Sequence, residues 1–203
     1  FVANPNNPTG TLIDQKTIDR FMERLPDDVI VVFDEAYYEY LDTPPDTLKF
    51  VRQGRNVVVL RTFSKIHGLA SARLGYGMAR PELIRVLQKT RAPFNVNGLV
   101  QAGALAALAD VEHQKKTKEV TDEGRAYLQA EFEKMGLPFV PSAANFVLVN
   151  VGEGKALFEA MLREGVIVRA LTGYPLLEWV RISVGTMEQN RRCIAALRKV
   201  LRA

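Results

Sequence analysis

The chain has 203 residues, of which 47% are hydrophobic and 25% are charged, a composition typical of an ordinary soluble globular protein and unlike that of a disordered or fibrous one. Its 27 basic and 23 acidic residues give a formal net charge of +4 and are scattered along the chain, which disfavours a nucleic-acid partner. The single cysteine, Cys193, excludes an internal disulfide, and no apolar run approaches the roughly 20 residues of a membrane helix. We therefore expect a cytoplasmic protein that does not bind a membrane.

The chain opens at Phe1, inside the apolar stretch Phe1-Val2-Ala3, with neither Met nor a signal-like segment before it. This opening predicts a fragment of a longer protein. Neighbouring strands of the sheet, and any site residues that they carry, are then expected outside these 203 residues.

In the first half of the chain, short apolar runs alternate with helical periodicity, the pattern of βα units around a parallel sheet. Apolar residues at Ile18, Phe21, Met22 and Leu25 follow the i, i+3, i+4, i+7 spacing, which predicts a helix with one face packed on that sheet. The predicted strands are 29–33, 57–61 and 74–79, and further helices are predicted from Pro81, over 97–110 and over 111–135.

After Pro138 the pattern changes to short strands at 145–150, 166–169 and 179–184, with helices at 155–164 and after Thr186. Gly165 stands where a helix C-cap is expected, and Thr186 with Gln189 predicts a capping box. We expect residues 1–115 to belong to an α/β domain with a mostly parallel sheet and residues 116–203 to form a smaller α+β domain.

Polar clusters follow the predicted strands at 4–10, 34–37 and 62–65, and Arg73 precedes the strand at 74–79. In open α/β sheets, ligands bind at the carboxyl ends of the strands. A lone lysine there is usually a surface residue. Lys65, however, follows the hydroxyls of Thr62 and Ser64 and precedes Arg73 by eight residues, and hydroxyls with a guanidinium are phosphate ligands.

Several motifs in one order carry a family resemblance over nearly the whole chain: NPNNPTG (4–10), DEAY (34–37), RTFSK (61–65), GLASARLGY (68–76), RAPFNVN (91–97), ANFVLV (144–149) and VRISVG (180–185). This set resembles the fold-type I aminotransferases that depend on pyridoxal 5'-phosphate (PLP), in particular the histidinol-phosphate aminotransferase group. The resemblance implies an aspartate-aminotransferase-like fold, in which 1–115 is the C-terminal part of the PLP-binding large domain. It also implies PLP as cofactor and a homodimer with its active site at the subunit boundary.

The resemblance implies roles for the residues that match the motifs. Lys65 is expected to bond covalently to the cofactor aldehyde and then to act as general acid and base. Asp34 is expected to face the pyridine nitrogen, although an aspartate after a strand is also a common helix N-cap. Asn7 and Tyr37 are expected to hydrogen-bond the cofactor's phenolic oxygen, with aromatic packing as the alternative for Tyr37.

Thr62, Ser64 and Arg73 are expected to bind the cofactor phosphate. By the same resemblance, Arg181 is expected to bind the substrate α-carboxylate and Arg169 a second anionic group. Asn145 either reaches the substrate carboxylate or is a structural hydrogen-bonding residue. No metal site is expected, because His67, His113 and Cys193 lack metal-ligand spacing and are interpreted as structural or surface residues.

The resemblance implies transamination between a small-molecule amino donor and a 2-oxo acid acceptor. The preferred pair is histidinol phosphate and 2-oxoglutarate, in histidine biosynthesis. Two alternatives stay open, a PLP lyase like threonine-phosphate decarboxylase and a non-catalytic PLP-binding regulatory module.

Overall fold

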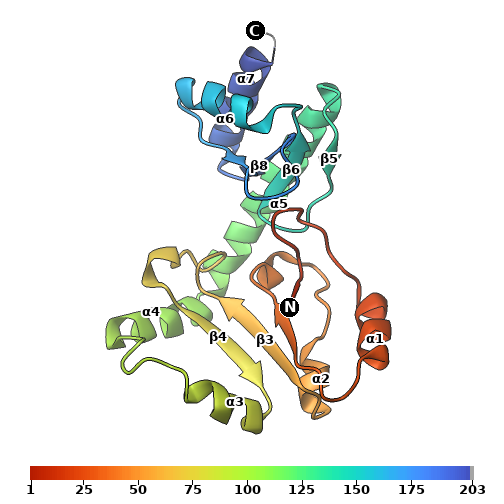
Figure 1. Ribbon diagram of the computed structural model, residues 1–203. Helices are drawn as coiled ribbons and strands as arrows, with labels where there is room; N and C mark the ends of the chain where they lie inside the picture. The colour runs from red at the N-terminus through yellow and green to blue at the C-terminus, as the bar shows by residue number, and fades with distance from the viewer. Residues whose placement is uncertain (202–203) are drawn as a thin grey trace. The chain divides into compact units, whose positions relative to one another are not determined.

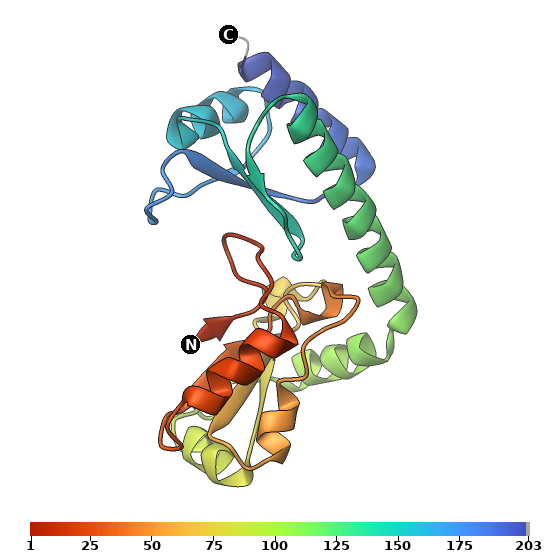
Figure 2. The ribbon, with the colours of Figure 1, turned by 90° about the vertical axis from the view of Figure 1, so that its right-hand side faces the viewer.

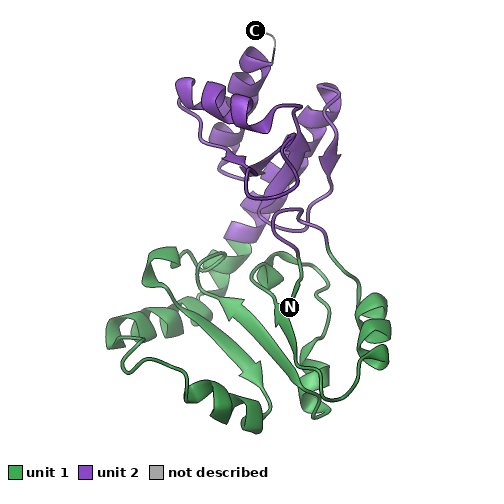
Figure 3. Ribbon diagram, in the orientation of Figure 1, with its two compact units in different colours: residues 1–5, 12–116 green, residues 6–11, 117–203 purple. Residues whose placement is uncertain are grey.

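The computed structural model describes residues 1–201, which form two compact units (Figure 3). The first unit comprises residues 1–5 and 12–116, and the second comprises residues 6–11 and the chain from Thr117 onward. The short segment 6–11 thus belongs to the second unit although it lies near the start of the chain. The domain limits predicted above, 1–115 and 116–203, stay a prediction.

The first unit contains a four-stranded sheet in the order β1-β2-β3-β4 (Figure 1). The pairs β1–β2 and β2–β3 are parallel, and β3–β4 is antiparallel, which confirms the predicted α/β class with a mostly parallel sheet. The strands are β1 (Val2–Ala3), β2 (Val31–Asp34), β3 (Val57–Thr62) and β4 (Gly75–Ala79).

The core of the first unit forms where helix α1 (Gln15–Arg24) packs against the sheet. Asp14 caps the helix by accepting a hydrogen bond of 2.7 Å from the Thr17 N–H. Ile18 and Met22 are buried in one cluster with residues of β2 and β3, whereas Phe21 is 41% exposed, so its predicted place on the packed face is wrong. The other elements of this unit are η1 (Tyr38–Tyr40), α2 (Leu48–Arg52), η2 (Ala70–Ala72), α3 (Pro81–Gln88) and α4 (Gly98–Ala109).

Helix α5 (Val111–Lys134) begins in the first unit and continues as one helix into the second (Figure 2). The second unit contains an antiparallel sheet in the order β5-β6-β8-β7. Alternate residues of β6 and β8 pack with α5, α6 and α7 in one core, as the period of two along a strand requires. The elements are β5 (Phe139–Val140), β6 (Phe146–Asn150), α6 (Gly154–Arg163), β7 (Arg169–Ala170), β8 (Trp179–Ser183) and α7 (Met187–Val200).

Several strand limits differ from those predicted. Strand β2 begins at Val31 because Val29 and Ile30 are exposed and precede the pairing with β1 and β3. The strand predicted at 166–169 is reduced to Arg169–Ala170, and Ile167 is 82% exposed. Among residues 1–201, no helix is long and apolar enough to cross a membrane, and no group of three His, Cys, Asp or Glu side chains could hold a metal ion.

Candidate active site

A pocket lies at the edge of the first unit's sheet where β2 and β3 end. Asp34 is the last residue of β2 and Thr62 the last of β3, and the carboxyl ends of parallel neighbours meet at one edge. The cavity has a volume of about 370 Å³. Its lining residues are Asp34, Ala36, Leu60, Arg61, Thr62, Ser64, Lys65 and Arg73, so five of the predicted site residues share one pocket.

Lys65 projects from a tight turn that follows β3. The Leu69 N–H closes this turn with a hydrogen bond of 2.9 Å to the Phe63 carbonyl. Inside it, Gly68 has a φ of +70°, a left-handed conformation that favours glycine, and its N–H bonds the Lys65 carbonyl at 2.9 Å. Phe63 and Ile66 are buried on either side, so the backbone that carries the Lys65 amine is anchored in the core.

The Lys65 ammonium lies against Tyr37. Its Nζ is 5.2 Å from the centroid of the Tyr37 ring, and Tyr37 is only 4% exposed. The ring therefore packs in the core, as the aromatic-packing alternative required, while it also forms part of the surroundings of the amine. The structure thus brings the predicted residues Tyr37 and Lys65 together.

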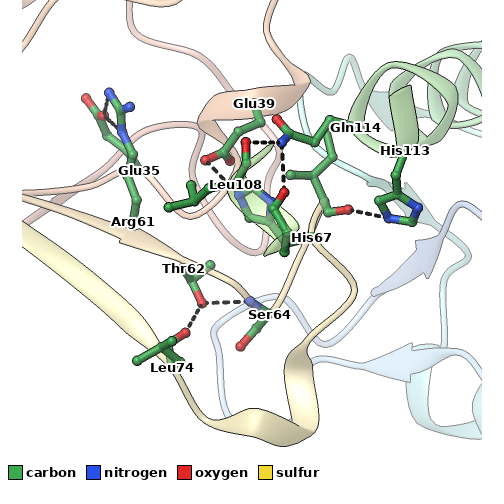
Figure 4. Close-up of polar contacts among 12 residues, drawn as sticks. Glu35, Glu39, Arg61, Thr62, Ser64, His67, Leu74, Leu108, His113 and Gln114 are labelled. Carbon is green, nitrogen blue, oxygen red and sulfur yellow. Dashed lines mark hydrogen bonds and ion pairs between the residues drawn. The ribbon is translucent and has the colours of Figure 1, made fainter. Parts of the chain in front are cut away.

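Two neutral hydroxyls and one cationic guanidinium form the anion-binding part of the pocket. The Thr62 hydroxyl accepts a hydrogen bond from the Ser64 N–H at 3.1 Å and donates to the Leu74 carbonyl at 3.4 Å, as Figure 4 shows. Arg73 Nη1 donates to the Ala70 carbonyl at 2.7 Å and lies 3.5 Å from Ser64 Oγ. These side chains present hydroxyl and N–H donors together, which is the chemistry of an anion site.

Asp34 supplies the pocket with a carboxylate. The side chain is exposed, and Oδ1 accepts a hydrogen bond of 3.2 Å from the Ala36 N–H. Asp34 does not cap a helix, because the next helical turn, η1, begins at Tyr38. A carboxylate and an amine thus line the same cavity as the anion site.

The next acid, Glu35, points into the core instead. It is 3% exposed, accepts a hydrogen bond from Thr47 Oγ1 and is bonded by Arg61 Nε at 3.0 Å. Burial raises the pKa of Glu35, and the Thr47 and Arg61 contacts partly offset this effect. Arg61, whose Cζ lies 3.4 Å from the centroid of the Tyr38 ring, was not predicted as a site residue although it lines the pocket.

The second unit holds the other predicted residues. Arg181 Nη1 donates a hydrogen bond of 2.5 Å to Asn7 Oδ1, and its guanidinium lies 5.0 Å from the centroid of the Phe146 ring. Arg169 is the register partner of Arg181 across β7 and β8. Two cations directly opposite each other in a ladder repel, so this pair favours an anion between them.

Asn145 precedes β6, and its backbone carbonyl accepts a hydrogen bond of 2.9 Å from the Val184 N–H. This backbone contact agrees with the structural alternative, while the role of its side chain stays a prediction. Asn7 lies within a tight turn of the same unit, in which the Gly10 N–H donates to the Asn6 carbonyl at 2.7 Å. Gly10 closes the turn at a φ of +76°, and a Cβ there would lie 2.1 Å from Ser142 Oγ.

Of the three residues that were interpreted as structural or surface residues, His67 and Cys193 are buried and His113 is exposed. His67 is 6% exposed and Cys193 is 8% exposed. His113 Nε2 is 3.1 Å from the Ile66 carbonyl, in the turn that carries Lys65. Their surroundings could not be read from spacing along the sequence, because each contact joins distant parts of the chain.

A mostly parallel sheet with a ligand pocket at its carboxyl edge is typical of α/β proteins that bind small molecules. The model of the aminotransferase class I and II family matches residues 1–197, and the chain belongs to this family.

Relatives within the family include histidinol-phosphate aminotransferases. The one from Akkermansia muciniphila is 56% identical over 201 residues, which cover 99% of this chain and 55% of that protein. The one from Symbiobacterium thermophilum is 50% identical, over 99% of this chain and 56% of that protein. The chain thus spans about half the length of these relatives.

A solved structure shows the same fold. It is the histidinol-phosphate aminotransferase from Sinorhizobium meliloti in complex with pyridoxal-5'-phosphate, which matches with a TM-score of 0.88 and 32% sequence identity. The match covers 98% of this chain and 56% of that one.

Proposed function

We propose that this chain is part of a PLP-dependent aminotransferase that transfers an amino group between histidinol phosphate and 2-oxoglutarate. The observation that carries the proposal is the single pocket that holds Lys65, Asp34, Ser64 and Arg73. The family and the histidinol-phosphate aminotransferases at 50–56% identity support the reaction and the substrate.

The chemistry of the pocket fits PLP. An aldehyde needs a primary amine, a pyridine nitrogen needs a carboxylate, and a phosphate needs cationic and neutral hydrogen-bond donors. Lys65 offers the amine, Asp34 the carboxylate, and Arg73 with Ser64 and Thr62 the donors, all around one cavity. When bound, PLP supplies an aldehyde that takes up amino groups and a ring that withdraws electrons from the substrate α-carbon.

The residues of the chain then have separate tasks. Arg73 and Ser64 bind and orient the phosphate, and Asp34 keeps a proton on the pyridine nitrogen by placing a negative charge beside it. The Lys65 amine holds the cofactor until substrate arrives and afterwards moves a proton at the substrate α-carbon. Asn7 and Tyr37 are proposed to hydrogen-bond the phenolic oxygen of the ring.

Substrate binding is assigned to the second unit's cations. Arg181 is already oriented by Asn7 and offers a planar pair of donors to a carboxylate. Arg169, opposite it across β7 and β8, offers a second cation for the phosphate of histidinol phosphate or the side-chain carboxylate of glutamate. Asn145 is proposed as a further ligand of the substrate carboxylate.

The two alternatives differ from this reaction in a measurable way. A lyase like threonine-phosphate decarboxylase would use the same lysine, aspartate and phosphate site but release carbon dioxide. A regulatory module would bind PLP without turnover. We favour the aminotransferase because the relatives with the highest identities described above carry that activity in their names.

Several further features belong to the same proposal. We propose a homodimer, because α4 and the segment before it leave large apolar side chains exposed, among them Phe94 at 99%, Leu99 at 88% and Leu105 at 70%. The domain limits 1–115 and 116–203 and a cytoplasmic location are also proposed. A full-length enzyme that sediments as a monomer at micromolar concentration would contradict the dimer.

The decisive experiment treats the full-length, PLP-loaded enzyme with borohydride and maps the labelled peptide by mass spectrometry. We expect the label on Lys65, its complete loss in Lys65→Ala, and its retention in Lys49→Ala, a control lysine of the same unit that pairs with Asp19 at 2.7 Å. Glutamate should convert the cofactor of the wild type to its amino form. Carbon dioxide release from phosphothreonine without that conversion would favour the lyase and refute the aminotransferase.

A further inference from the structure

A partly buried acid, Glu39, approaches a buried histidine, His67, close in sequence to Tyr37 and Lys65. Glu39 Oε1 and His67 Nε2 are 3.8 Å apart, with side chains that are 14% and 2% exposed (Figure 4). Within residues 1–201, Glu39 Oε2 and both ring nitrogens of His67 have no hydrogen-bond partner. Because buried polar groups are nearly always hydrogen-bonded, retaining two such groups here requires a reason other than stability.

The pair connects the two segments that carry the site in the first unit. His67 lies two residues after Lys65 in the same turn, and Glu39 lies two residues after Tyr37 in η1. On the other side of this connection, Lys65 Nζ lies 5.2 Å from the Tyr37 ring. The pair therefore brings the turn that carries Lys65 close to the segment that follows Tyr37.

Further contacts of the lysine turn are made with Phe63 and with helix α5. The His67 ring packs beside the Phe63 ring, with 5.1 Å between their centroids. His113 of α5 contacts the Ile66 carbonyl at 3.1 Å, and Ile66 is 1% exposed. The Glu39 and His67 side chains thus add a polar approach between η1 and this anchored turn.

The electrostatics are consistent with an uncharged pair. Burial raises the pKa of Glu39, with Arg61 opposing and Glu35 adding to the shift. Burial also lowers the pKa of His67; a backbone interaction with Ala107 opposes this shift, and the nearby His113 adds to it. Both shifts disfavour the charged forms, in agreement with the cost of desolvating a buried charge.

We propose that Glu39 and His67 are positioning residues that hold the turn of Lys65 in register with Tyr37, so that the lysine amine is pre-oriented for the reaction. This inference rests on the proposed function of Lys65. Neither side chain lines the pocket, so neither is expected to touch substrate or cofactor. Removing the pair should loosen the placement of the amine and leave the amine itself available.

The test uses the full-length, PLP-loaded enzyme with Glu39→Gln, His67→Gln and the double substitution. We expect kcat to fall on the order of ten- to a hundredfold, the range that follows a displacement of about 1 Å in an active site, with KM little changed. Borohydride should still label Lys65. Amide hydrogen exchange should rise in peptides that cover 63–69, and the double variant should be no worse than the poorer single variant, because the two residues act as one unit.

Two controls separate positioning from loss of stability. Glu82→Gln breaks an exposed ion pair with Arg85, and Glu131→Gln breaks partly buried ion pairs with Lys134 and Arg198 in the second unit. Neither should change exchange over 63–69. The inference is overturned if the Glu39 and His67 variants keep kcat and amide hydrogen exchange within twofold of the wild type. It is also overturned if the effects of the two single substitutions on kcat add in the double variant. A uniform rise in amide exchange along the chain, with kcat per folded enzyme unchanged, would overturn it as well.

The result also tells this inference apart from the proposed function. A wild-type enzyme that carries no label on Lys65 overturns the proposed function and the positioning role together. A labelled, active wild type whose Glu39 and His67 variants match it overturns the positioning role alone.

Discussion

The backbone conformation of Arg73 allows one substitution to test its role in cofactor binding separately from its effect on the stability of the fold. Its φ of 52° and ψ of 45° place it in the left-handed region, which costs a residue with a Cβ about 1–2 kcal/mol. Arg73→Gly removes that cost. Glycine, however, loses about 0.5–1 kcal/mol through the entropy of the unfolded chain, and the exposed hydrogen bond to the Ala70 carbonyl contributes a similar amount. The free energy of unfolding of the cofactor-free enzyme should therefore change by less than about 1 kcal/mol.

Binding of the cofactor should respond quite differently. Arg73 is the guanidinium of the pocket proposed to face the phosphate, and hydrogen bonds to charged groups contribute about 1.5–3 kcal/mol. Losing them corresponds to a rise in the Kd for PLP of about 10- to 150-fold. An arginine in a strained conformation is thus expected to be retained for the ligand and not for the fold.

Two measurements on the full-length protein check this. Urea unfolding of the cofactor-free enzyme gives the stability, and absorbance titration with PLP gives the Kd. Arg73→Lys is the matched control, since it keeps the strain and the charge but loses the planar pair of donors, and its Kd should fall between the other two. If Arg73→Gly destabilises the cofactor-free enzyme by more than about 2 kcal/mol, or binds PLP within twofold of wild type, the reasoning is refuted.

Two further predictions concern the buried side chains of Glu35 and Cys193, neither of which lines the pocket. Glu35→Ala leaves Arg61 without its acid partner and should lower the free energy of unfolding by about 3–5 kcal/mol, as measured by urea titration. A loss below about 1 kcal/mol would show that the ion pair is not structurally important. Burial raises the pKa of Cys193 from 9.0 to about 11, so iodoacetamide at pH 8 should label it only after unfolding, and equal labelling of the native enzyme would contradict its burial. Because the folded pKa is the higher one, the contribution of this thiol to stability is complete below pH 9.0 and is lost as the pH rises through about 11.

Elements with local signals were predicted well from the sequence. The capping box of Thr186 and Gln189 forms at the start of α7, Pro81 begins α3, and Gly165 has the left-handed φ of +71° expected after α6. These features depend on residues within one turn of each other, so the sequence contains the cause of each.

Features that depend on tertiary contacts were predicted poorly. The antiparallel direction of β4 is not encoded in the periodicity of a strand, which is the same for both directions. Val29 and Ile30 have high β propensity, yet they lie before the point where β2 gains neighbours. Likewise, the exposed Phe21 fits the helical spacing of α1 but meets no partner among the described residues of the core cluster.

The same difference between local and tertiary features applies to the candidate site. Thr62, Ser64, Lys65 and Arg73 line one pocket with Asp34, because the parallel strands β2 and β3 end at the same edge of the sheet. Their roles in binding a cofactor stay a prediction. The contact between Glu39 and His67 joins residues 28 positions apart, and nothing in their spacing indicates it. A buried acid facing a buried histidine becomes visible only when η1 and the lysine turn have been placed together.

The adjacent acids Asp34 and Glu35 show how the sheet assigns chemistry to sequence. Burial alternates along β2 and its next residue: Val31, Phe33 and Glu35 are buried, whereas Asp34 is exposed at the pocket. Successive side chains of a strand point to opposite faces, and this alternation extends to Glu35, which is buried in the core while Asp34 lines the pocket. A shift of one residue in the pairing of β2 with β3 would exchange them, leaving Arg61 without its partner and the pocket with a longer acid. The register that buries Phe33 between its neighbours is therefore also what places the Asp34 carboxylate in the pocket of Lys65.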